Sequence, residues 1–162
     1  MSNAIDVMDP QQTRVWVYQA NQPFSSQDIP EIRRQLNDFA RQWVSHNRRL
    51  LAAGEVLHDR FVVLMADESH VDAGGCSIDR SVTFLKGLQA AYGVDLFDRM
   101  RFSYLDKNGD VHTVDRPTFA RLYAEGFIDD QTPVFDTLVA NKADFDRAFV
   151  KPLAQSWHKR MV

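Results

Sequence analysis

The sequence contains one cysteine, Cys76, among 162 residues. A single thiol excludes an intrachain disulfide framework and is typical of proteins from a reducing compartment. Long apolar runs are also missing, since stretches such as FVVLMA are far shorter than the roughly 20 residues of a membrane-spanning helix. The start of the chain, MSNAIDVMDP, has no basic segment followed by an apolar one, so we expect no signal peptide. These absences predict a cytoplasmic protein with no membrane partner.

Common nucleotide-binding and hydrolase motifs are absent as well. The sequence contains no GxxxxGK[ST], no GxGxxG and no GxSxG, so neither a P-loop, nor a dinucleotide-binding turn, nor a nucleophile elbow is encoded. We therefore expect no binding or hydrolysis of ATP. The net charge of −3 gives no general attraction to nucleic acid. We expect no nucleic-acid partner.

The composition is that of an ordinary globular protein. Hydrophobic residues make up 44% of the chain and charged residues 25%, which is enough apolar material for a real core. No repeat, low-complexity tract or linker divides the sequence. We expect one domain over residues 1–162, in which residues 1–12 form a flexible N-terminal arm.

Hydrophobic periodicity predicts the elements of the first half. Residues 14–20, RVWVYQA, are rich in β-branched and aromatic side chains, which favour a strand. The next segment has helical spacing, and we expect a helix from near residues 26–28 to near His46 with one apolar stripe, made of Ile29, Ile32, Leu36, Phe39 and Trp43. Residues 50–68 indicate two strands joined by a tight turn at residues 58–60.

The second half begins with another amphipathic pattern. It predicts a helix over residues 77–92, ended by Gly93, with a stripe formed by Ile78, Val82, Leu85, Leu88 or Gln89, and Tyr92. Asn108-Gly109 is a strong hairpin signature, and Pro117 suits the first turn of a short helix. The tail again shows helical spacing, interrupted at Pro152, and we expect Trp157 to dock it against the domain.

The predicted element order is β-α-β-β-α-β, followed by a further strand and C-terminal helices. This order indicates an α+β fold with a ferredoxin-like core and an added hairpin strand. Because that architecture supports many unrelated functions, it specifies none.

The stretch VDAGGCSID, residues 71–79, is the best candidate site. Backbone N–H groups at a helix start are unpaired and favour negative charge. In this interpretation Gly74 and Gly75 allow close backbone approach, while Cys76 and Ser77 offer polar contacts. Ser77 could also cap the helix, and Asp79 would add favourable charge in its first turn.

Two residues are candidates for catalysis at this loop, Cys76 as a thiol and His70 as a proton carrier. The opposing interpretation is a packing cysteine behind a tight turn, because free cysteine is among the most buried residue types. We expect a partly buried, slowly reacting thiol whose loop borders a pocket.

Metal binding is the other chemistry that this loop suggests. DESHVD places four potential ligands within six residues, namely Asp67, Glu68, His70 and Asp72. Their spacing matches no established site. DKNGDV resembles the start of a calcium loop, but Val111 stands where glycine is required and Pro117 where glutamate is required. We expect neither a metal nor a cofactor.

Several segments resemble a family of short bacterial proteins that often carry the automatic label "ABC transporter ATPase". They are RVWVYQAN, GCSIDRSVTFLKGLQAAYGVDLFDRM, VFDTLVAN and SWHKR, and GCSID with the tail SWH is the most specific part. The resemblance implies a self-contained cytoplasmic protein and transfers no catalytic residue. The label itself conflicts with the missing Walker A loop.

Two functional hypotheses follow. In the first, a small cytoplasmic domain binds a small molecule at residues 74–77. In the second, the protein is a non-enzymatic interaction module or homodimer that uses an exposed sheet face or edge strand. A pocket at the Cys76 loop favours the first hypothesis, and a contiguous exposed apolar patch favours the second.

Overall fold

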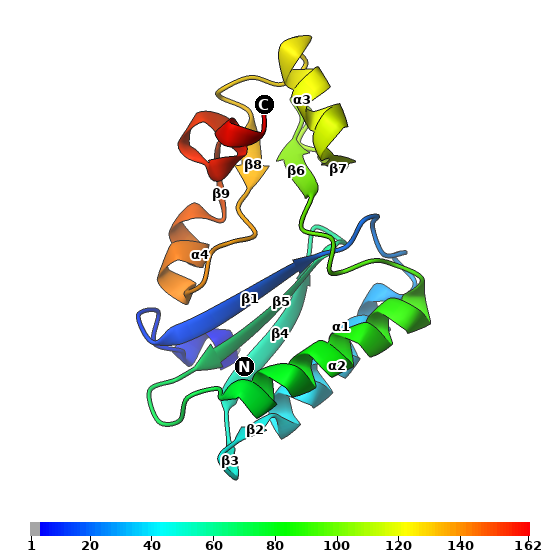
Figure 1. Cartoon of the computed structure of the whole chain (residues 1–162). Helices are drawn as coiled ribbons and strands as arrows, with labels where there is room; N and C mark the ends of the chain where they lie inside the picture. Colours follow the sequence, from blue (N-terminus) through cyan, green and yellow to red (C-terminus); the bar gives the residue numbers. More distant parts are fainter. Residues whose placement is uncertain (1–3) are drawn as a thin grey trace.

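Three antiparallel strands form the first sheet of the structure, a computed structural model that describes residues 4–162 (Figure 1). They are β1 (Thr13–Gln19), β4 (Leu51–Leu57) and β5 (Phe61–Asp67), in the order β1-β5-β4. β5 is buried along its whole length, as the apolar pattern of a central strand requires. His58 and Asp59 join β4 to β5 with φ angles of 50° and 60°, so the predicted tight turn is confirmed.

Two helices cover one face of this sheet (Figure 1). α1 (Ile29–Gln42) buries a stripe of apolar residues against it, Ile29, Ile32, Leu36 and Ala40. The helix ends earlier than predicted, because the chain leaves helical geometry at Trp43, where ψ is 122°. The following residues form a small hairpin of β2 (Val44–Ser45) and β3 (Arg48–Arg49) instead.

The second helix, α2 (Gly75–Tyr92), begins two residues before the predicted start. Gly93 ends it with φ at 65°, which confirms the glycine stop. Its buried stripe differs from the expected one and runs through Ser77, Ser81, Leu85 and Leu88. Two serines thus lie on the face that the sequence pattern assigned to apolar residues.

A second sheet contains the C-terminal strands in the order β7-β6-β8-β9. Its strands are β6 (Arg101–Leu105), β7 (Val111–Asp115), β8 (Pro133–Phe135) and β9 (Val150–Pro152). β6 and β7 form the predicted hairpin around Gly109, whose φ is 84°. β6 meets β8 at a single residue pair, Tyr104 with Val134, because Pro133 has no N–H to continue the ladder.

The remaining helices are short. They are α3 (Arg116–Ala124), α4 (Lys142–Ala148) and three 3₁₀ turns, η1 (Ala4–Val7), η2 (Leu153–Gln155) and η3 (Trp157–Met161). The helix from Pro117 is therefore confirmed. A continuous C-terminal helix is not formed, because residues 150–152 pair with β8 as β9. No helix within residues 4–162 has both the length and the apolar character to cross a bilayer.

The second sheet packs over the face of the first sheet that the helices leave free. Three phenylalanines join the two: Phe61 of β5 lies 4.9 Å from Phe135 of β8 and 5.3 Å from Phe149, between ring centroids. Met8, 3% exposed, belongs to the same cluster. Residues 1–3 of the expected N-terminal arm lie outside the described residues, whereas Asp9 donates its N–H to Asp67 Oδ2 at 2.9 Å.

The mixed α+β class is confirmed. A ferredoxin-like topology is not confirmed, because such a core needs a fourth strand beside β1. β6, which the sequence order placed there, pairs with β7 and β8 in the second sheet. On its free edge, β1 forms an isolated β-bridge between Arg14 and Asn141 where the fourth strand of a ferredoxin-like sheet would pair.

Candidate functional site

The predicted loop borders a cavity of about 340 Å³ at the N-terminus of α2. Two segments far apart in the sequence line it, residues 44–47 of the small hairpin and residues 74–77 with Arg80 at the helix start. Four of the five residues predicted as ligand-binding, Gly74, Gly75, Cys76 and Ser77, are therefore brought together here. The hairpin and Arg80 are the part that sequence reasoning missed.

Backbone conformation places the hairpin tip. His46 and Asn47 have φ angles of 52° and 63°, a left-handed pair typical of two-residue hairpin turns. Asparagine and histidine tolerate this conformation better than most residues. His-Asn within VSHNRR is thus the signal that could have located this turn, and with it the second wall of the cavity.

Hydrogen bonds fasten the hairpin to the helix start. Ser45 donates its hydroxyl to the carbonyl of Asp72 at 2.5 Å and accepts the N–H of Gly74 at 3.2 Å. Ser77 donates to the carbonyl of Val44 at 2.7 Å. The buried indole of Trp43 donates to the carbonyl of Ser77 at 2.8 Å. These bonds hold the two walls of the cavity in a fixed relation.

Three backbone amides at the start of α2 have no partner among the described residues. Gly74 is the cap residue, and no side chain caps the helix. The first helical bond runs from Ile78 N–H to the Gly74 carbonyl at 3.0 Å, which leaves the N–H groups of Gly75, Cys76 and Ser77 unused. All three residues line the cavity. Unpaired amides at the positive end of an 18-residue helix favour an anionic group.

The side chains around the cavity add positive charge. Arg80 lines it, and within the described chain this arginine makes no ion pair. Arg48 pairs with Ser45 across the hairpin but does not line the cavity. His46 Nε2 comes within 3.5 Å of the point where a Cβ on Gly74 would stand. A Cβ at residue 74 would therefore make only an ordinary van der Waals contact with His46.

Several predictions about individual residues are corrected. Ser77 is not a cap, because the helix starts earlier and its hydroxyl is used by Val44; it is buried and offers a ligand only its N–H. Asp79 lies beyond the first helical turn and does not line the cavity. His70 is exposed and also does not line it.

Cys76 is exposed, so the expectation of a partly buried thiol was wrong. The reason is its position on the helix. The stripe that faces the sheet starts at Ser77 and continues at Ser81 and Leu85, and Cys76 lies to one side of this stripe. Its thiol borders the cavity without being packed behind the glycines.

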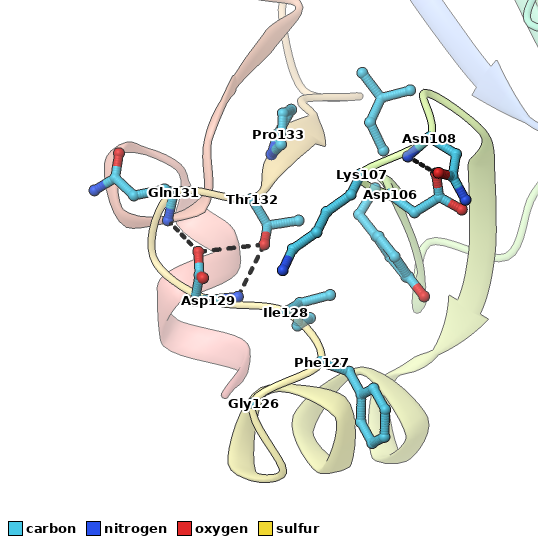
Figure 2. A pocket seen from close by; sticks show the side chains of 12 residues that line it. Asp106, Lys107, Asn108, Gly126, Phe127, Ile128, Asp129, Gln131, Thr132 and Pro133 are labelled. Carbon is cyan, nitrogen blue, oxygen red and sulfur yellow. Dashed lines mark hydrogen bonds between the residues drawn. The ribbon is translucent and has the colours of Figure 1, made fainter.

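A larger cavity, of about 530 Å³, lies at the second sheet (Figure 2). It opens where β6 and β8 diverge, between the 104–108 turn and the 126–133 loop. Lys107 extends across it. The two carboxylates at its rim accept hydrogen bonds within their own turns. Asp106 accepts the N–H of Asn108 at 2.8 Å, and Asp129 accepts the N–H of Gln131 at 2.8 Å.

A serine-histidine pair in the tail is structural. Ser156 Oγ lies 2.6 Å from His158 Nδ1, a geometry also found in nucleophilic sites. Both residues are buried, with His158 0% exposed, and neither lines either of these two cavities. Burial lowers the pKa of His158 to about 4. A substrate has no access to this pair.

No protein-family model matches the chain, and neither a curated protein nor a solved structure matches it. In the part of the chain that the structure describes, no three His, Cys, Asp or Glu side chains come together in a way that could hold a metal ion.

Proposed function

We propose that the protein binds a small molecule bearing a carboxylate or phosphate group in the cavity at the start of α2. The observation that supports this most is the set of three unused amides, of Gly75, Cys76 and Ser77, in a cavity that Arg80 also lines. The amide N–H groups donate hydrogen bonds to the anion from one side, and the Arg80 guanidinium donates to it from the other. Cys76 stands beside the bound anion, and no reaction is assigned to it.

Nuclear magnetic resonance tests this proposal with inorganic phosphate and acetate as probes. Saturable shifts of the amide signals of residues 75–77 are expected for at least one of them. Arg80→Gln should weaken the binding roughly tenfold, the range of one charge-assisted hydrogen bond. Lys86→Gln is the matched control, because Lys86 is exposed on the same helix and does not line the cavity. Shifts that fail to saturate, or equal losses in both variants, would refute the proposal.

The interaction module is the second candidate. The feature that favours it is the exposed apolar side chains of the C-terminal half, where Leu138 is 61% and Val150 is 40% exposed. Val150 starts β9, an edge strand of the second sheet. A homodimer through this edge would appear in sedimentation velocity, and Val150→Lys would abolish it. A monomer at all concentrations would exclude the homodimer.

We also propose that β1, α1, β4, β5 and α2 derive from a ferredoxin-like unit whose fourth strand joined the second sheet. The strand order β1-β5-β4 supports this relation. The resemblance to the short bacterial family and the cytoplasmic location stay predictions, the second supported by the single cysteine.

A further inference from the structure

The larger cavity, at the second sheet, has the volume of a small-molecule site, about 530 Å³ (Figure 2). It lies beside the single residue pair that joins β6 to β8. Its apolar lining includes Ile128, 2% exposed, and Tyr104, 9% exposed, together with Leu105 and Pro133. This cavity shares no lining residue with the cavity of the proposed function. An apolar group of a ligand would be shielded from water here.

A backbone acceptor in this cavity has no donor within the sheet. Asp106 donates its N–H to the Asp110 carbonyl at 2.9 Å across the β6–β7 hairpin. Neighbouring residues of an antiparallel strand direct their backbone groups to opposite sides, so the carbonyl of Leu105 faces β8. The register of β6 and β8 places Pro133 opposite Leu105, and proline has no N–H to donate. The Leu105 carbonyl is therefore available to accept the N–H of a ligand.

A cation in the cavity also lacks a partner. Lys107 extends across the cavity (Figure 2). Its ammonium group forms no ion pair within the described residues, where the lysines that do so are Lys142, Lys151 and Lys159. A carboxylate brought by a ligand would pair with this ammonium group.

The two acidic residues at the rim already accept hydrogen bonds from the protein. Asp106 Oδ1 accepts the N–H of Asp110 at 3.0 Å, and its Oδ2 lies 2.7 Å from Nε2 of His112. Asp129 accepts the N–H of Gln131. Their negative charge still disfavours a ligand with several negative charges, such as a nucleotide, and limits the ligand to one carboxylate.

We propose that this cavity binds an amino acid that is acylated on its nitrogen and has an apolar side chain, either free or as the C-terminal residue of a peptide. The side chain packs against Ile128 and Tyr104. The amide N–H donates to the Leu105 carbonyl, and the carboxylate pairs with Lys107. Acylation matters because a free amino acid would bring a second ammonium group close to Lys107.

N-acetyl-L-leucine and three truncated analogues test this inference by nuclear magnetic resonance. Each analogue lacks one recognised group: N-acetylglycine the side chain, 4-methylpentanoate the amide, and N-acetyl-L-leucinamide the carboxylate. N-acetyl-L-leucine should give saturable amide shifts at residues 104–107 and 127–132, and each analogue should bind at least about fivefold more weakly. No saturable shift, equal affinity for an analogue, or shifts confined to residues 75–77, which line the other cavity, would overturn the proposal.

The peptide N-acetyl-alanyl-alanyl-leucine distinguishes the two sources of the ligand. Binding about tenfold tighter than that of N-acetyl-L-leucine would support a peptide C-terminus, and equal or weaker binding would support the free acylated amino acid. Both outcomes require the same amide shifts at residues 104–107.

Two variants separate binding from folding. Pro133→Ala supplies an N–H opposite the Leu105 carbonyl, so the variant should fold, protect the new amide from hydrogen exchange and bind N-acetyl-L-leucine several-fold more weakly. Pro152→Ala, the matched change on β9 outside the cavity, should bind like the parent. Lys107→Gln should weaken the binding of N-acetyl-L-leucine and not that of N-acetyl-L-leucinamide, and Lys86→Gln should change neither. Full affinity for N-acetyl-L-leucine in Pro133→Ala or in Lys107→Gln would overturn the proposal.

Discussion

Trp157 donates its indole N–H to Asp136 Oδ1 at 2.8 Å, while Lys151 Nζ lies 2.7 Å from Oδ2 of the same carboxylate. Burial alone would raise the pKa of Asp136, but the bonds from Lys151, Trp157 and the Leu138 N–H outweigh it and keep the pKa below its ordinary value. The ring of Trp157 also packs edge-on against Phe102 at 5.5 Å. The tail is therefore docked by both a polar and an aromatic contact.

Replacing this tryptophan should loosen the tail. Trp157→Ala removes the ring and the hydrogen bond together, and we expect the free energy of unfolding to fall by about 2–4 kcal/mol. Trp157→Phe keeps a ring against Phe102 and loses only the bond to Asp136, so about 1–2 kcal/mol is expected. Urea unfolding measures both. Unchanged stability in Trp157→Ala would mean that the tail is undocked in solution.

The buried His158 makes stability depend on pH. Burial depresses its pKa from 6.5 to about 4, Asp136 opposing the shift and Lys151 adding to it. Between pH 6.5 and pH 4, this histidine is therefore protonated in the unfolded chain and neutral in the folded protein. The contribution of neutral His158 to the free energy of unfolding is fully present above pH 6.5. About 3 kcal/mol of that free energy is lost as the pH falls to 4.

His158→Phe supplies the control for this titration. A phenylalanine keeps the packing with Phe102 and Phe119 and leaves no titratable ring. As the pH is lowered from 7 to 5, the urea concentration at the unfolding midpoint should fall for the parent and stay constant for the variant. Parallel slopes would assign the pH dependence to other groups.

The charges near Cys76 should show in its alkylation rate. Because the thiol is exposed, native protein should react with iodoacetamide nearly as fast as unfolded chain. Arg80 and the helix start should attract the negative reagent iodoacetate. The ratio of the iodoacetate rate to the iodoacetamide rate should therefore be about two- to fivefold higher in the folded protein than in the unfolded chain. Arg80→Gln should reduce this preference and Lys86→Gln should not. Identical preferences in folded and unfolded protein would mean that no positive field acts at the thiol.

Gly54 of β4 lies close against α1. A Cβ there would lie 3.0 Å from Leu36 Cβ and 3.3 Å from Leu64 Cδ2. Gly54→Ala should therefore destabilise by about 1–3 kcal/mol. Gly87→Ala, with nothing within 4 Å of the added atom, should stabilise by about 0.5–1 kcal/mol as a helix-interior change. Thermal melts of the two variants should move in opposite directions.

Local patterns were sufficient wherever a local preference determines the structure. The turn at His58 and Asp59, the hairpin at Gly109 and the helix stop at Gly93 were all predicted, because each depends on residues that are adjacent in the chain. The end of α1 was not predicted. Trp43 continues the apolar stripe in sequence, yet its indole bonds to Ser77 O, a contact 34 residues away, and this tertiary contact accompanies the exit from the helix.

The candidate site was half predictable for the same reason. Gly74 to Ser77 form a continuous segment with a recognisable helix start. The opposite wall, from Val44 to Asn47, depended on a hairpin hidden in the expected helix end. The strand order could not be predicted either, because the apolar residues of β6 suit either sheet. Phe102 of β6 packs against Phe119 of α3 and against Trp157, contacts with residues later in the chain that the local pattern does not show.

The shared aromatic cluster between the sheets has a consequence for synthesis on the ribosome. Val15, Val63 and Met65 lie on the face of the first sheet that Phe135 and Phe149 cover. While the chain is being made, the strands that bear these residues emerge long before residue 135. The nascent first sheet therefore presents an uncovered apolar face during much of elongation, which makes that interval the one in which a chaperone would bind the chain.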